Sequence, residues 1–96
     1  MYAMESVLIE YRPSAYPAVE AAVLAALVEG GARVILDLDT LDTLDTDGVR
    51  GLITLLRRAR SVGGELALSS TKAEVLRTLQ VTALDRIFKM VEAEAA

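Results

Sequence analysis

The fold is decided by residues 33–64, RVILDLDTLDTLDTDGVRGLITLLRRARSVGG. This stretch opens with Arg33-Val-Ile-Leu-Asp-Leu38, a continuous run that is typical of a strand buried on both faces of a parallel sheet. Apolar side chains then recur at the spacing of an amphipathic helix, which is later ended by Gly63-Gly64. They are Val49, Leu52, Ile53, Leu56 and Ala59. A buried strand followed by an amphipathic helix predicts an α/β fold.

The segments on either side continue this alternation. Upstream, Ser6-Val-Leu-Ile-Glu10 predicts a strand at a sheet edge. Residues 17–29 predict a helix, because Pro17 suits a first helical position and Ala and Leu follow it. We expect Gly30-Gly31 to supply the turn that ends this helix. Downstream, residues 65–69 alternate as a further strand.

The end of the chain adds two short elements. Thr71-Lys-Ala-Glu74 has the form of a capping box, which predicts a helix over residues 72–79. Residues 81–91 predict a short helix or strand that closes the core. Strands that alternate with helices across short turns favour a parallel or mixed sheet covered by helices. We therefore expect one α/β domain over residues 1–96, with a central mixed β-sheet packed against α-helices.

The composition excludes several classes of function. Ten basic and fourteen acidic residues give a net charge of −4, which opposes binding to a nucleic acid. No apolar run approaches the ~20 residues that span a bilayer, and the start lacks a basic leader segment, so we expect a cytoplasmic protein without membrane insertion. The chain has no Cys and no His, which removes thiol nucleophiles, imidazole bases and the usual zinc ligands. The sequence predicts no enzyme activity and no cofactor.

Five aspartates make the loop after the buried strand the most unusual local chemistry in the chain. They are Asp37, Asp39, Asp42, Asp45 and Asp47. The run Asp45-Thr-Asp47-Gly48 resembles the middle of a calcium loop, but the outer ligand positions fall on Thr43 and Thr54, so we expect no metal site. A phosphoacceptor aspartate would need a positioned cation, which the sequence does not place. The alternative is structural, because Asp and Thr bond their own backbone in turns and caps.

The start of the following helix has a different potential. Asp45 or Thr46 is the natural N-cap, since either side chain can accept from the free N–H groups of the first turn. The same N–H groups can receive a phosphate. A hydroxyl at Thr46 is therefore well placed for modification.

Several segments in this order resemble the STAS domain of anti-sigma-factor antagonists. They are Val34-Ile-Leu-Asp-Leu38, Leu44-Asp-Thr-Asp-Gly48-Val49, Leu52 through Ala59, Gly63-Gly64-Glu-Leu66 and Val81-Thr-Ala-Leu-Asp-Arg-Ile-Phe88. In that family a strand leads to an Asp-Ser-Ser-Gly or Asp-Ser-Thr-Gly turn, and an anti-sigma kinase phosphorylates the second hydroxyl. Many members close with Thr-Gly-Leu-Asp-Arg-Leu-Phe, similar to residues 82–88 here. The resemblance covers about residues 15–88.

The resemblance implies a regulatory turn over four residues. Asp45 takes the place of the family Asp, Thr46 that of the first hydroxyl, Asp47 that of the phosphorylated hydroxyl and Gly48 that of the glycine. An Asp cannot carry a stable phosphoester, and its carboxylate has one negative charge where a phosphoserine has about −1.5 to −2. The first half of the chain also departs from the family, because Tyr11-Arg-Pro-Ser-Ala-Tyr16 replaces the second half of its N-terminal hairpin.

The resemblance implies a binding module rather than a catalyst. Its partner would be an anti-sigma factor or a serine-protein-kinase-like protein, docked on the turn and the helix that follows. The expected partner-binding residues are Asp39, Asp42, Asp47, Val49 and Arg50. The alternative function is an accessory subunit of an ATP-binding-cassette lipid transport complex, whose STAS turn also keeps a hydroxyl directly after the Asp, as Thr46 does. A homodimer through an uncovered sheet edge is a further expectation.

Overall fold

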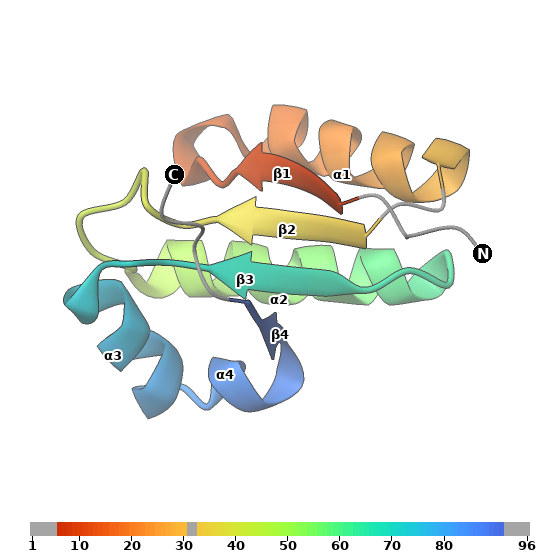
Figure 1. Ribbon diagram of the computed structural model, residues 1–96. Coiled ribbons are helices and arrows are strands. Elements are labelled where there is room, and N and C mark those ends of the chain that lie inside the picture. Colours follow the sequence, from red (N-terminus) through yellow and green to blue (C-terminus); the bar gives the residue numbers. More distant parts are fainter. Residues whose placement is uncertain (1–5, 31–32, 92–96) are drawn as a thin grey trace.

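The computed structural model describes residues 6–30 and 33–91, and it contains one parallel sheet with helices (Figure 1). The four strands are β1 (Ser6–Glu10), β2 (Arg33–Asp37), β3 (Leu66–Ser69) and β4 (Lys89–Met90). The helices are the 3-10 turn η1 (Pro13–Ala15), α1 (Tyr16–Gly30), α2 (Thr46–Ser61), α3 (Ala73–Val81) and α4 (Leu84–Ile87). The predicted α/β class is confirmed.

The sheet has the order β1-β2-β3-β4, and every pair in the described part of the chain is parallel. A mixed sheet was expected, so this detail is a correction. It follows from the connections, because each pair of consecutive strands is joined by a helical crossover, which brings the chain back to start the next strand at the same end. β1 lies at the edge, as predicted, and its Leu8 side chain is 62% exposed. The homodimer through this edge stays a prediction.

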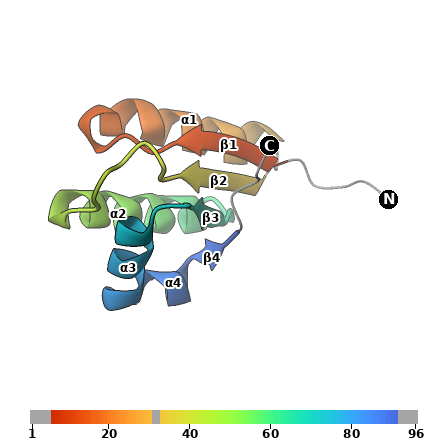
Figure 2. The same ribbon diagram turned by 60° about the vertical axis from the view of Figure 1, so that its left-hand side comes forward.

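α1 and α2 lie side by side behind the sheet, and α3 and α4 lie beyond β3 (Figures 1 and 2). The core between these layers is almost entirely aliphatic, as a sequence with 4% aromatic residues requires. In β2, Val34 and Leu36 are fully buried while the alternate Ile35 is only partly buried. The expectation that this strand is buried on both faces is therefore wrong for the face away from α1 and α2.

The amphipathic stripe predicted for α2 faces the core. Leu52, Leu56 and Ala59 are buried, and Ile53 is partly buried against them. Leu55 was not part of the predicted stripe but is also fully buried. Burying such a side chain contributes about 1.5–3 kcal/mol, so α2 is held by packing on the sheet.

The turns that end the helices agree in part with the sequence. Gly63 has φ +77°, the left-handed backbone that favours glycine after α2. The turn predicted at Gly30-Gly31 extends outside the described residues. The capping box predicted at Thr71 is wrong: α3 begins at Ala73, its N-cap Lys72 makes no side-chain cap bond, and the Thr71 hydroxyl donates elsewhere. In the ranges 6–30 and 33–91 no helix is both long and apolar enough to cross a bilayer.

Candidate functional site

The candidate site lies at the carboxyl edge of the sheet, where the loop after β2 leads into α2. Asp45 is the N-cap of α2, and its Oδ1 accepts from the Gly48 N–H at 2.8 Å. This settles the alternative that the sequence left open between Asp45 and Thr46. Thr46 is the first helical residue and Asp47 lies in the first turn. We call residues 45–48 the acidic turn.

Asp39 joins this loop to the start of α3. Its carboxylate accepts from the Thr71 N–H at 2.7 Å, from the Thr71 hydroxyl at 2.9 Å and from the Ser70 hydroxyl at 3.0 Å. These donors, led by the Thr71 N–H, hold the pKa of Asp39 below its usual value. The Asp39 N–H itself donates to Asp37 Oδ1 at 2.9 Å. The Thr71 hydroxyl, which was predicted to accept from a backbone N–H at the start of α3, makes no cap bond and donates to this carboxylate.

Tyr11 supports the acidic turn from its buried side. Its side chain is fully buried, and its hydroxyl donates to the Gly48 carbonyl at 2.6 Å. The Tyr11 backbone also accepts from the Thr40 hydroxyl at 2.7 Å and donates to the Asp37 carbonyl at 2.9 Å. Burial, together with smaller contributions from the nearby Tyr16 and Asp45, raises the pKa of Tyr11 to about 12. The residue therefore stays neutral and ties the end of β1 to both ends of the loop.

Sequence reasoning missed this role of Tyr11. The signal that could have found it is the pair Gly48 and Gly51, one helical turn apart in an otherwise regular helix. A Cβ on Gly51 would collide with the Tyr11 hydroxyl, and a Cβ on Gly48 would lie 2.8 Å from Leu44 Cδ1. Two such glycines on one face of a helix indicate that something bulky packs close against it.

A groove of about 440 Å³ opens beside the acidic turn. Its lining comes from η1, from the loop after β2 and from the acidic turn: Pro13, Ser14, Leu41, Thr43, Leu44, Asp45, Asp47 and Gly48. The groove thus combines apolar side chains with two carboxylates. That combination suits a positively charged side chain with an apolar stem, such as Arg or Lys.

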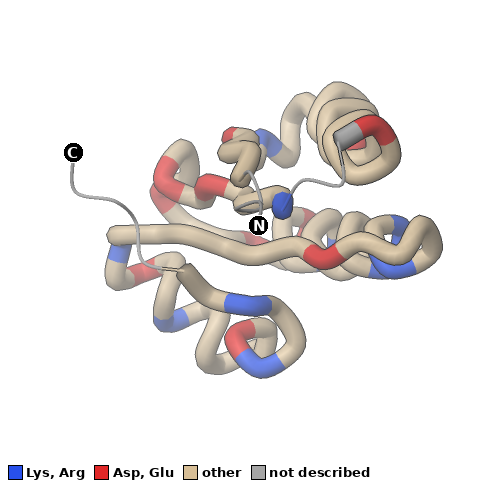
Figure 3. Tube along the Cα trace, turned by 45° about the vertical axis from the view of Figure 1, so that its right-hand side comes forward, with Lys and Arg blue, Asp and Glu red and all other residues tan. Residues whose placement is uncertain are grey.

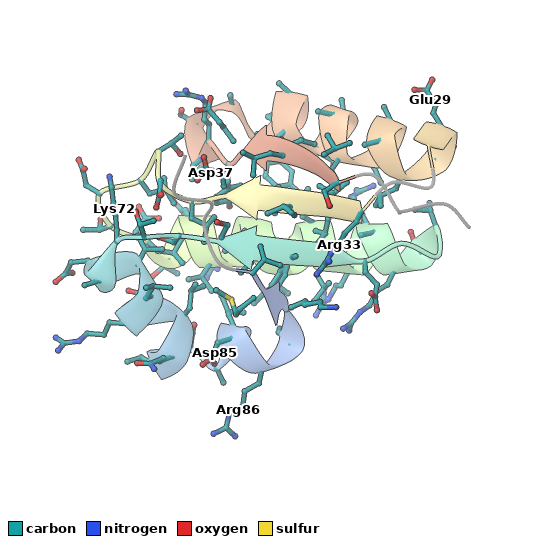
Figure 4. All side chains as sticks on the ribbon, in the orientation of Figure 1. Glu29, Arg33, Asp37, Lys72, Asp85 and Arg86 are labelled. Carbon is teal, nitrogen blue, oxygen red and sulfur yellow. The ribbon has the colours of Figure 1, made fainter. Side chains whose placement is uncertain are left out.

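The other predicted site residues divide between two sides of the loop. Asp39 and Asp42 both bond residues at the start of α3, where Asp42 forms an exposed ion pair with Lys72 at 3.4 Å. Lys72 is labelled in Figure 4. Asp47, Thr46 and Arg50 are exposed near the groove, and within the described ranges Asp47 has no hydrogen bond or ion pair from its side chain. Val49 is partly buried against the core.

The five aspartates do not converge on one point. Each of three carboxylates accepts from a different backbone N–H: Asp45 from Gly48 in α2, Asp39 from Thr71 before α3, and Asp37 from Asp39. Across residues 6–30 and 33–91, no three acidic side chains come close enough together to hold a metal ion. The tube in Figure 3 shows these acidic positions gathered on the loop before α2, while basic positions gather at the other end of that helix.

Sequence comparison relates the chain to one family. The model of the STAS domain matches residues 14–96. "Putative anti-sigma factor antagonist BtrV" of Bordetella bronchiseptica is 31% identical over 77 residues, 80% of this chain and 66% of that protein. "Putative anti-sigma factor antagonist TM1081 homolog" of Thermotoga neapolitana is 33% identical over 66 residues, 69% of this chain and 58% of that protein. The chain spans about two thirds or less of the length of these relatives.

Solved structures have the same fold. The NMR structure of the protein TM1081 superposes with a TM-score of 0.72 at 22% identity, over 97% of this chain and 78% of the other. The crystal structure of a protein from Thermotoga maritima described as a putative anti-sigma factor antagonist gives 0.66 at 24% identity, over 96% and 74%. At these identities the likeness concerns the fold alone. Since the family model matches all but the first thirteen residues, the chain belongs to the STAS domain family.

Proposed function

We propose that this domain is a protein-interaction module of bacterial partner-switching signalling, of the anti-sigma factor antagonist type. The observation that carries the proposal is the groove at the start of α2, with the exposed Asp47 carboxylate at its rim. The names of the two curated relatives support the class of partner, an anti-sigma factor or a serine-protein-kinase-like protein. The partner docks on the acidic turn and on the exposed side of α2 that follows it.

Asp47 acts in this proposal as a permanent charge. It stands where the family carries the phosphorylated hydroxyl, so the turn presents one negative charge in every state of the cell. A partner surface built for a neutral hydroxyl would bury this carboxylate unpaired, which costs several kcal/mol. A partner that binds this domain must therefore face the turn with a cation. Charge-assisted bonds to a carboxylate are about twice as strong as neutral ones, so Asp47 contributes to affinity.

The residues that line the groove indicate which type of partner side chain would bind there. Asp45 uses one carboxylate oxygen to cap α2, so of the two carboxylates that line the groove only Asp47 accepts no hydrogen bond from a described residue. Leu41, Leu44 and Pro13 provide apolar walls at the same place. An Arg of the partner would pack its stem on these walls and direct its guanidinium to Asp47.

Thr46 is the one hydroxyl in the acidic turn and is exposed. We propose it as the site where a phosphate would release the partner. A phosphate there would bring about −1.5 to −2 charges into a turn that already holds two carboxylates, and its bulk would obstruct the groove. Intact-mass measurement of the protein from its native cells tests this. Protein that carries no phosphate under any growth or stress condition would contradict it.

Affinity capture from native cells tests the proposed function itself. The wild-type domain should recover an anti-sigma factor or a kinase-like protein, and Asp47→Lys should lose it. Glu74→Lys is the matched control, since Glu74 is also an exposed acid in the first turn of a helix, but of α3. Equal recovery by Asp47→Lys would show that the acidic turn is not the docking surface. Recovery of ATP-binding-cassette ATPase subunits instead would favour the transport alternative.

A further inference from the structure

The outer edge of β1 has backbone groups that no strand covers within residues 6–30 and 33–91. β1 pairs only with β2 there, and the Tyr11 N–H that follows β1 donates to the Asp37 carbonyl at 2.9 Å. The N–H and C=O groups of successive strand residues point to opposite sides of the strand. Those of Ser6, Leu8 and Glu10 therefore point away from β2, where they are available to another strand.

β1 lacks features that normally keep a strand edge from pairing. It has no Lys and no Pro, and its one charged residue, Glu10, forms an ion pair with Arg12 at 2.9 Å. Ile9 packs against the core, so the alternate Leu8 lies on the opposite face of the sheet. Leu8 is 62% exposed. The edge of the sheet is thus both apolar and open.

α1, which packs behind β1, is apolar on its exposed side as well as on its buried side. Its exposed residues before Glu29 are Pro17, Ala18, Ala21, Ala22, Ala25 and Val28. α2 provides the contrast within this chain, because its exposed residues are all Thr, Ser, Asp or Arg. A helix that is apolar on every side is normally covered on every side. The exposed side of α1 therefore indicates a further contact.

The flank of α1 next to the β1 edge consists of alanines. Glu20 of α1 forms an ion pair with Arg58 of α2 at 2.9 Å, which identifies the flank that faces α2. Figures 1 and 2 show α1 on the β1 side of α2. At 3.6 residues per turn, the flank opposite Glu20 holds Ala18, Ala22 and Ala25. We call these three alanines, together with Ser6, Leu8 and Glu10, the edge surface.

We propose that a second copy of this chain covers the edge surface, by antiparallel pairing of β1 with the same strand of the second copy about a two-fold axis near Leu8. Neighbouring strands in a sheet lie about 4.8 Å apart. α1 contacts both β1 and β2, so it lies behind the space between them. The axes of the two α1 helices would therefore be about 10 Å apart, which is the separation of packed helices. Alanine side chains allow this approach.

The strand and the helix together favour a second copy over a single extended peptide. A peptide strand would pair with β1 but would leave the alanines of α1 uncovered. A second copy supplies a strand and a helix at once, because a two-fold axis brings the same surface of both copies together. α1 has 15 residues and is about 22 Å long. A face of that length buries at most about 500 Å² per copy, so we expect a weak, reversible dimer.

The edge surface is separate from the groove beside the acidic turn. None of its residues lines that groove. The dimer therefore does not depend on the signalling partner proposed above, and its test needs no partner.

Analytical ultracentrifugation of the domain between about 5 and about 500 µM tests the proposal. The mass should rise from that of one copy to that of two as the concentration increases. Leu8→Lys and Ala22→Lys should each raise the dissociation constant at least about tenfold, because either places a charge inside the interface. Both residues are exposed, so the fold should tolerate the changes, which circular dichroism checks. Val81→Lys is the matched control, since Val81 is 80% exposed on α3, outside the edge surface.

Amide hydrogen exchange of the unmutated chain gives a second readout. The Leu8 N–H should exchange several-fold more slowly at high protein concentration, because the second copy then accepts from it. The Asp47 N–H, which lies outside the edge surface, should exchange at the same rate at both concentrations. Equal exchange of Leu8 at both concentrations would overturn the proposal. So would a domain that stays monomeric throughout, species larger than a dimer, a dimer that survives either Leu8→Lys or Ala22→Lys, or an equal loss in Val81→Lys.

Discussion

The Tyr11 hydroxyl donates to the Gly48 carbonyl at 2.6 Å, which joins the residue after β1 to the first turn of α2. Thirty-seven residues separate the two in sequence, and the bond is buried. The acidic turn is therefore part of the core scaffold rather than a free loop. Its exposed residues, Thr46 and Asp47, are presented on a support that is held from both sides, by Tyr11 and by the Asp45 cap.

Removing the Tyr11 hydroxyl should weaken this support. Tyr11→Phe should lower the free energy of unfolding by about 1 kcal/mol, because one buried hydrogen bond is lost while the ring is kept. It should also speed amide hydrogen exchange in the first turn of α2. Urea unfolding and exchange measured by NMR check both effects. Tyr16→Phe is the control, since its hydroxyl bonds only the partly buried Glu20 carboxylate. Equal exchange rates at Gly48 and Val49 in both variants would contradict this role of Tyr11.

Gly51 lacks a side chain where the Tyr11 hydroxyl packs against α2, so the effect of adding a methyl group at Gly51 should depend on that hydroxyl. Gly51→Ala should destabilise the wild-type domain by about 1–3 kcal/mol, because its Cβ would overlap the Tyr11 hydroxyl. In the Tyr11→Phe background the same change should be nearly neutral, because the gain of about 1 kcal/mol in helix propensity is offset by the tight contact with Tyr16 Cδ2 at 3.3 Å. A double-mutant cycle from urea unfolding measures the coupling. Additive effects would show that the close approach carries no energy.

Asp39 should make the free energy of unfolding of the domain depend on pH in the acidic range. Its pKa in the folded state lies below the ordinary value of 3.8, mainly because the Thr71 N–H donates to it. The stabilisation is therefore fully present above pH 3.8 and is lost as the pH falls through the lower pKa of the folded state. Asp39→Asn should be less stable than wild type at neutral pH, and the difference should shrink in acid. Urea unfolding between pH 7 and pH 2 checks this, with Asp85→Asn as control. A difference that is constant over this range would contradict the bonding described for Asp39.

Ala83 is the one described residue other than glycine with a positive φ, at 60°. A left-handed backbone costs a residue with a Cβ about 1–2 kcal/mol, and glycine avoids most of that cost. Ala83→Gly should therefore raise the free energy of unfolding by about 1 kcal/mol. Ala73→Gly at the start of α3 is the control and should lower it. Loss of stability in Ala83→Gly would show that the turn between α3 and α4 is not strained.

The sequence predicted the fold well where one pattern dominated. The strand around Val34, the stripe of α2 and the edge position of β1 followed from periodicity and from turn residues, and they agree with the structure. Contacts between distant loops could not be predicted. The Thr71 hydroxyl has a local use in a capping box and a distant one at Asp39, and only the packing of the two loops decides between them. Tyr11 belonged to a segment without periodicity, so its buried bond to Gly48 had no local signature.

The central claim is that partner binding depends on the negative charge of the Asp47 side chain. The most direct test is the affinity of the domain for the captured partner, measured by calorimetry. Asp47→Asn keeps the shape of the side chain and removes its charge, so it should bind at least about tenfold more weakly than wild type. Asp47→Ser should be weakened similarly. Glu74→Gln should bind like wild type, because Glu74 lies away from the groove. Equal affinities for wild type, Asp47→Asn and Asp47→Ser would contradict the account, because the turn would then not stand in for a phosphorylated residue.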